Sequence, residues 1–174
     1  DGTTATQCTH SAQAPKFVEA NVCKDCPSGS TCDGAIAAVC THSNDIPKYV
    51  LVNVCTDCPS GSTCNGATAT VCTSTDAAPK FVDTNVCTTC PAGYTCNGAT
   101  ATECTSSYSA PKYVLTNVCT ACPSGYTCNG TSKTQCTHSN QVPKYVNTNS
   151  CDACPSGNTC DGAAATESVS YTHL

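Results

Sequence analysis

The residues of this chain with the most obvious chemical potential are its cysteines, three of which fall within CKDCPSGSTC (23–32). Cys23 and Cys26 form a C-x-x-C pair, a spacing found in redox-active dithiols, in zinc sites and among structural disulfides. A redox pair needs a thiolate of lowered pKa, typically at a helix N-terminus within a βαβ unit. The sequence indicates no such helix, and Pro27 follows the pair directly. Thiol catalysis is therefore disfavoured.

The cysteines recur with a fixed period of 32 residues. Five copies of C-x14-C-x2-C-x5-C are joined by seven-residue segments, without insertion or deletion. A fixed period of about 20–50 residues indicates an array of like units. The predicted divisions are a partial lead-in, five repeats and a polar C-terminal tail: 1–7, 8–39, 40–71, 72–103, 104–135, 136–167 and 168–174.

Disulfide bonding is favoured over zinc for these cysteines, because zinc sites usually combine two close pairs of ligands. Here the first cysteine of each copy stands 15 residues before the second. Four cysteines permit three pairings, and a bridge within C-x-x-C is the least suitable. Pairing first with second and third with fourth is slightly favoured over first with third and second with fourth. A rival is a polymer in which a terminal cysteine bonds the next chain. The favoured pairs are Cys8–Cys23, Cys26–Cys32, Cys40–Cys55, Cys58–Cys64, Cys72–Cys87, Cys90–Cys96, Cys104–Cys119, Cys122–Cys128, Cys136–Cys151 and Cys154–Cys160.

The composition points to a fold held together by covalent bonds. Twenty of the 174 residues are cysteine, whereas Leu, Ile, Val and Phe together contribute only 21. That apolar share lies below the rough 20% that an ordinary core requires. Such cysteine usage is typical of extracellular proteins, so we expect a secreted or surface-anchored chain. The net charge of −5 argues against binding to nucleic acid.

The segments between the cysteines indicate strands and turns. The run KYVLVNVC (48–55) is aromatic and β-branched and predicts one strand, which begins after Pro47. The CPSG segments predict turns, and Asn65-Gly66 predicts a hairpin whose returning strand is ATATVC (67–72). We therefore expect small disulfide-rich β and loop repeats with little or no helix, stacked as an elongated tandem rod.

Two other residue types recur at fixed positions. His10, His42 and His138 stand two residues after the first cysteine, where the fourth copy has Ser106, so we expect solvated loop residues and not ligands. A lysine such as Lys16 precedes the aromatic residue in every copy. We interpret this lysine as a strand residue that keeps its charge in water. Alternatively, it is the exposed lysine that a protease inhibitor presents to its protease.

Glycans are expected on this chain. Asn129-Gly130-Thr131 is its standard N-glycosylation sequon. Serine and threonine make up more than a quarter of the residues, so O-linked glycans are also expected.

The segments CPSGSTCNGATATVC (58–72) and CPAGYTCNGATATEC (90–104) resemble the cysteine-periodic, GPI-anchored immobilisation antigens of ciliates. They are more loosely similar to growth-factor-receptor-like repeats of the CPAGYYC type. The resemblance covers about residues 8–160. It implies a secreted precursor with a removed C-terminal tail, displayed as a surface coat and tied to the membrane only through a lipid. Ser168 and Ser170 are small enough for lipid attachment.

Together these features predict a structural extracellular repeat protein, either a cell-surface coat antigen or the subunit of an extracellular filament that self-associates. The alternative is a secreted adhesive or protease-inhibiting module, and such a binder usually varies one copy to make its site. No carboxylate pair, nucleophile triad or phosphate-binding glycine loop stands out in the sequence. We therefore expect no enzymatic activity, no cofactor and no metal.

Overall fold

The computed structural model describes residues 8–168, and within them it forms twenty short strands and no helix. The strands pair as two-stranded antiparallel hairpins, two in each 32-residue repeat. The chain is thus a tandem array of small disulfide-rich β modules, as the sequence predicts. We number the modules 1 to 5 by the repeats defined above. The lead-in 1–7 and the tail from residue 169, with Ser170, lie outside the described residues.

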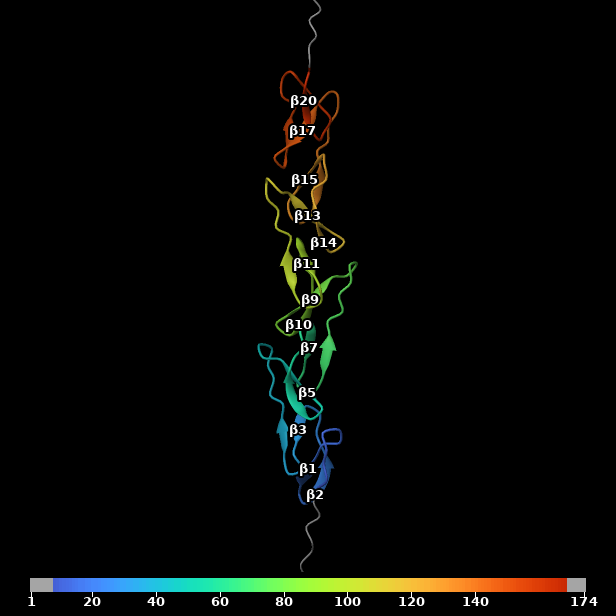
Figure 1. The fold of residues 1–174 in the computed structure, drawn as a ribbon, viewed down its shortest axis with the longest axis vertical. Coiled ribbons are helices and arrows are strands. Elements are labelled where there is room, and N and C mark those ends of the chain that lie inside the picture. Colours follow the sequence, from blue (N-terminus) through green and yellow to red (C-terminus); the bar gives the residue numbers. More distant parts are fainter. Residues whose placement is uncertain (1–7, 169–174) are drawn as a thin grey trace, which may run out of the picture. The chain divides into compact units, whose positions relative to one another are not determined.

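The hairpins follow one another along the chain (Figure 1). In each module the first hairpin begins at the lysine of the Pro-Lys motif, and the first strand of the second hairpin ends at the fourth cysteine. The first hairpins are β1 (Lys16–Glu19) with β2 (Val22–Asp25), β5 (Lys48–Leu51) with β6 (Val54–Asp57), β9 (Lys80–Asp83) with β10 (Val86–Thr89), β13 (Lys112–Leu115) with β14 (Val118–Ala121), and β17 (Lys144–Asn147) with β18 (Ser150–Ala153). The second hairpins are β3 (Ser30–Cys32) with β4 (Ala37–Val39), β7 (Ser62–Cys64) with β8 (Ala69–Val71), β11 (Tyr94–Cys96) with β12 (Ala101–Glu103), β15 (Tyr126–Cys128) with β16 (Lys133–Gln135), and β19 (Asn158–Cys160) with β20 (Ala165–Glu167).

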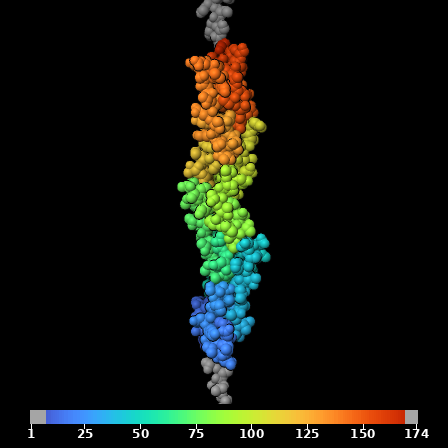
Figure 2. Space-filling view, turned by 180° about the vertical axis from the view of Figure 1, so that it is seen from behind, coloured from blue at the N-terminus to red at the C-terminus, as the bar shows by residue number. Residues whose placement is uncertain are grey.

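The contacts divide the chain into two compact units. The first contains the residues up to Thr75 together with Lys80–Thr89 and Asn97–Thr100, and so holds β1 to β10. The second contains Asp76–Pro79, Cys90–Cys96 and the residues from Ala101 on, and holds β11 to β20. Within each unit, atoms of successive modules adjoin one another (Figure 2). Strand contacts between modules recur in one form, β3 with β6 and β7 with β10 in the first unit, β11 with β14 and β15 with β18 in the second.

The first hairpin corrects the prediction of a single strand over KYVLVNVC. The run folds back on itself, since β5 and β6 pair antiparallel with Leu51 opposite Val54. Between them, Val52 and Asn53 have φ of 46° and 60°. Positive φ at both central residues is the mark of a type I′ turn, whose twist suits a two-residue hairpin. A β-branched residue rarely adopts this conformation, so Val52 does not indicate a turn at the level of sequence.

The second hairpin follows the prediction more closely. The CPSG segment forms a turn in which the Ser30 N–H donates to the Pro27 carbonyl at 3.1 Å. Gly29 has a φ of 77°, which the third position of a type II turn requires. The Asn65-Gly66 dipeptide lies in the loop between β7 and β8, and β8 is the predicted returning strand.

Sulfur atoms take the place of an aliphatic core. Among residues 8–168, the buried apolar side chains are Tyr113 and nine cysteines, whereas large apolar side chains such as Val39 and Val71 are more than 70% exposed. No helix among the described residues is long and apolar enough to span a membrane. Covalent bridges and backbone hydrogen bonds therefore hold each module together.

Candidate functional site at the module junctions

All twenty cysteines are bonded within the chain, two bridges to each module. In every module the first cysteine bonds the second and the third bonds the fourth, which is the pairing the sequence favours. In module 1 the Cα atoms of Cys8 and Cys23 lie 5.5 Å apart, and those of Cys26 and Cys32 lie 5.9 Å apart. The C-x-x-C pair therefore belongs to two different bridges.

An asparagine in each type I′ turn joins its module to the one before. The Asn53 amide donates from Nδ2 to the Cys32 carbonyl at 2.7 Å, and its Oδ1 accepts the Cys32 N–H at 2.7 Å. This amide reproduces the two hydrogen bonds that a neighbouring strand would make to the outer edge of β3. We call this arrangement the asparagine fastener.

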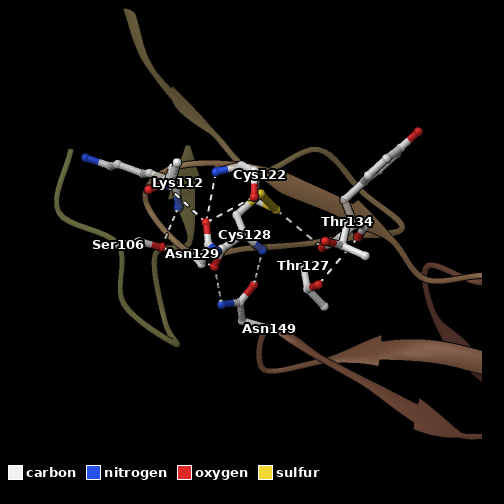
Figure 3. Close-up of a disulfide and its surroundings, with 11 residues drawn as sticks. Ser106, Lys112, Cys122, Thr127, Cys128, Asn129, Thr134 and Asn149 are labelled. Carbon is white, nitrogen blue, oxygen red and sulfur yellow. Dashed lines mark hydrogen bonds between the residues drawn. A yellow bond between two sulfur atoms is a disulfide. The ribbon is translucent and has the colours of Figure 1, made fainter. Parts of the chain in front are cut away.

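The fastener recurs at every junction between modules, with hydrogen bonds of 2.7–2.8 Å. Figure 3 shows the one at the junction of modules 4 and 5, where the Asn149 amide faces the backbone of Cys128. The Ser106 hydroxyl also donates to the Cys128 carbonyl, at 3.4 Å. The fasteners are Asn53 with Cys32, Asn85 with Cys64, Asn117 with Cys96, and Asn149 with Cys128.

Small residues allow the modules to approach closely at the same junctions. A Cβ atom built on Gly29 would lie 3.7 Å from the Gly66 carbonyl carbon and 3.8 Å from the Cβ of Ala67. Gly61 meets Ala99 in the same way, and Gly125 meets Ala163. At three of the four junctions the fastener is therefore combined with a small apolar contact, whereas at the junction of modules 3 and 4 Gly93 faces the hydroxyl of Thr131.

Shallow hollows lie beside the fasteners. One of about 350 Å³ is lined by His10, Thr31 and Asn53, and another of about 350 Å³ by His42, Thr63 and Asn85. In module 4 two hollows of about 300 Å³ each share Tyr108, Asn129 and Asn149 in their lining. These volumes lie at the lower end of the roughly 300–1,000 Å³ usual for ligand pockets. The walls of the hollow beside Asn85 and of the two in module 4 are rich in hydroxyl and amide groups.

Comparison with protein-family models, curated proteins and solved structures found no match.

The recurring histidines differ among themselves. His10 and His42 are exposed and pack over glycine, since a Cβ on Gly34 or Gly66 would lie 2.8 Å from the Cδ2 of the nearer ring. His138 departs from the expectation of a solvated residue, because its Nδ1 is buried and has no hydrogen-bond partner among the described residues. In the described part of the chain, no three His, Cys, Asp or Glu side chains are grouped to hold a metal ion.

The recurring lysines lie in strands. Lys16 stands opposite Asp25 in the β1–β2 hairpin with a 3.3 Å ion pair, and Lys48 pairs with Asp57 at 3.4 Å. The Lys16 carbonyl also accepts the Gly34 N–H at 2.9 Å, which ties the two hairpins of the module together. The lysine backbone is thus fixed on both sides, unlike that of a free inhibitory loop.

The predicted modification sites lie on the surface. Asn129 is exposed in the loop between β15 and β16. Ser168 is exposed at the end of module 5, and its N–H donates to the Gly157 carbonyl at 2.9 Å. Ser170 lies beyond the described residues.

Two functional contacts were not anticipated from the sequence. The fastener asparagine stands two residues before the second cysteine in all five copies. This recurrence is the one feature of the sequence that could have indicated its role. Module 4 also places the Lys133 ammonium over two aromatic rings, 5.3 Å from the Tyr113 centroid and 4.9 Å from that of Tyr126. The other four copies have alanine at the position of Lys133, so this cation–π contact distinguishes module 4.

Acid is expected to weaken the second hairpins of modules 1 and 5 selectively. Hydrogen bonds from the backbone N–H groups of Ile36 and Ala35 lower the pKa of Asp33, and those of Ala164 and Ala163 lower the pKa of Asp161. Because the folded pKa is depressed, this stabilisation is complete above the unfolded pKa of about 3.9 and is lost as pH falls through the lower folded pKa.

The matched control for this acid effect is built into the chain. Modules 2 to 4 carry asparagine at the same position, where Asn65 accepts the same two backbone hydrogen bonds. Amide exchange and carboxyl NMR titrations should show β3–β4 loosening in acid while β7–β8 does not, and Asp33→Asn should remove the difference. Equal acid sensitivity of the two hairpins would contradict the prediction.

Proposed function

We propose that this chain is a structural extracellular repeat protein that forms part of a cell-surface coat or an extracellular filament. The observation that carries the proposal is the asparagine fastener, repeated at every junction and combined with two bridges in each module. Disulfide-rich repeated modules are consistent with an extracellular structural or cell-surface protein. The ten bridges indicate an oxidising environment.

The proposed role requires no catalytic chemistry. The bonded cysteines are neither nucleophiles nor ligands in this state. The junction uses backbone groups, an amide and small residues, which suit assembly better than reaction. The resemblance to ciliate immobilisation antigens supports a coat. A lipid at Ser168 or Ser170 would then anchor it, and release of the protein from cells by a phosphatidylinositol-specific phospholipase tests this anchoring.

Self-association is proposed because modules 1 and 5 carry complementary halves of a junction. Asn21 has the turn conformation of the fastener asparagines, with a φ of 61°, but is exposed and has no side-chain partner among the described residues. In module 5, a Cβ on Gly157 would meet nothing within 4 Å among residues 8–168, and Cys160 is less buried than its counterparts. Asn21 of one copy therefore matches Cys160 of another, in a head-to-tail contact.

The test of self-association is sedimentation of the oxidised 174-residue chain over a range of concentrations, with electron microscopy of the same samples. Asn21→Ala should lower the association constant about tenfold, because two hydrogen bonds are lost. Ala35→Lys should also lower it, since Ala35 corresponds to the small residues that meet glycine at the internal junctions. Asn140→Ala, on an exposed loop, is the control. Association of Asn21→Ala at the level of the native chain would overturn the head-to-tail contact.

The alternative role is a secreted adhesive or protease-inhibiting module. The strand position of Lys16 and Lys48 disfavours an inhibitor, and a trypsin inhibition assay separates the two functions directly. Inhibition at stoichiometric concentration would replace the structural proposal.

A further inference from the structure

Module 4 combines two residues that the other modules do not bring together. Tyr108 is 75% exposed, and it lines both module 4 hollows together with Asn129, the acceptor of the N-glycosylation sequon. The residues at the position of Tyr108 in the other modules are not aromatic: Ala12, Asn44, Asp76 and Asn140.

We propose that Asn129 carries an N-linked glycan whose first N-acetylglucosamine lies against the ring of Tyr108. The site goes beyond the structural role, because it fixes the direction of a glycan on one module of the array.

The Asn129 side chain is oriented by its own loop. Its Oδ1 accepts the backbone N–H of Thr131 at 3.1 Å and that of Ser132 at 2.8 Å, and the Ser132 hydroxyl at 3.4 Å. These bonds occupy the oxygen and leave Nδ2, the atom to be glycosylated, without a partner among the described residues. Asn129 is exposed beside the fastener of Cys128 and Asn149 (Figure 3). The acceptor nitrogen is thus held on the surface.

The surroundings of Asn129 suit a sugar. Ser106 and Ser107 line one hollow, and Ser132 and Thr134 line the other, so hydroxyl groups are present on both sides. The weakly positive C–H face of a pyranose complements the negative face of an aromatic ring and covers its apolar surface. Tyr108 offers such a face at the place where the first sugar emerges.

The modification itself is an ordinary transfer that the secretory pathway supplies. The donor is a polyisoprenyl-pyrophosphate-linked oligosaccharide. The Asn129 Nδ2 forms a bond to the anomeric carbon of its first sugar while the bond from that carbon to the pyrophosphate oxygen breaks. The polyisoprenyl pyrophosphate leaves with the bonding electrons, and Nδ2 loses one proton.

The other modules supply matched controls. Asn65-Gly66-Ala67 forms the same loop, with Oδ1 accepting the N–H groups of Ala67 and Thr68, but it lacks the sequon hydroxyl. Ala67→Thr therefore creates a sequon in the same loop geometry, with Asn44 in place of the tyrosine. Conversely, Thr131→Ala removes the module 4 sequon by introducing the residue that the other modules tolerate at that site.

The experiment uses the full chain secreted from eukaryotic cells. Intact mass should show a glycan on the native chain that Thr131→Ala eliminates. In the native chain, proton NMR should show ring-current shifts of the first sugar and cross-peaks to Tyr108. Tyr108→Asn should abolish both and accelerate release of the glycan from the folded protein by peptide-N-glycosidase by about two- to tenfold. The Ala67→Thr glycan should lack the shifts.

The outcomes separate the two parts of the proposal. An unmodified Asn129 in the secreted chain would overturn it, whether or not Ala67→Thr is glycosylated. A glycan at Asn129 without ring-current shifts, released equally fast from the native chain and from Tyr108→Asn, would overturn the role of Tyr108. Neither result bears on self-association, which Asn21→Ala tests separately.

Discussion

Reduction of the ten disulfides is expected to unfold all five modules. The longer bridges span 15 residues and the shorter ones span six. In the chain-entropy account these closures contribute about 3 and about 2 kcal/mol respectively. After reduction no aliphatic core would hold the modules together, because the buried apolar side chains of residues 8–168 are nine cysteines and one tyrosine. The two-stranded hairpins that remain are at best marginally stable in water.

Amide NMR spectra of the oxidised chain and of the reduced, alkylated chain at neutral pH provide the measurement. The expected change is collapse of the dispersed hairpin resonances upon reduction. Two double variants measure the contribution of each bridge of module 4 separately. Cys104→Ala with Cys119→Ala should cost about 3 kcal/mol of unfolding free energy and Cys122→Ala with Cys128→Ala about 2 kcal/mol, each with an added cost for the cavity left by buried Cys104 or Cys128. Hairpins that persist in the reduced chain would show that backbone pairing suffices.

The second large effect is expected from Asn149→Ala at the junction of modules 4 and 5. The change removes two hydrogen bonds of 2.7 Å and leaves the N–H of buried Cys128 without its acceptor. An unsatisfied buried donor costs about 1–3 kcal/mol. The φ of Asn149 is 60°, a conformation that alanine adopts at a cost of about 1–2 kcal/mol.

The control for Asn149→Ala is Asn21→Ala, measured at concentrations too low for self-association. Asn21 has the same backbone conformation but no fastener partner among the described residues, so its substitution reports the conformational cost alone. Exchange of the Cys128 amide in Asn149→Ala should accelerate about 30-fold or more beyond any effect of Asn21→Ala on its own module. Equal effects of the two changes would show that the fastener contributes nothing to stability.

The sequence predicts the repeat architecture well because cysteine spacing is a strong constraint. The period, the absence of helix in residues 8–168 and the loop after Cys64 are all visible in the pattern. The turn at Val52-Asn53 could not be predicted, since valine at positive φ runs against its local preference. The module packing, and not Val52 itself, selects that conformation.

The fastener escaped prediction for a different reason. Asn53 binds a cysteine 21 residues earlier, in another module, through backbone atoms that leave no trace in the sequence. Likewise, the contact of Lys133 with Tyr113 depends on how the two hairpins of module 4 are placed. Such contacts follow from the fold and cannot be read from spacing alone.

The reliance of the fastener on backbone atoms also determines which sequence changes the array tolerates. Each junction uses an asparagine and a glycine that faces an alanine or a threonine, whereas the polar segment after the first cysteine contributes none of them. Insertion or deletion of one whole 32-residue unit would leave every remaining junction with its partners intact. The gene can therefore change the length of the protein by unequal recombination between repeats, and can diversify the loops independently, without redesigning the fold.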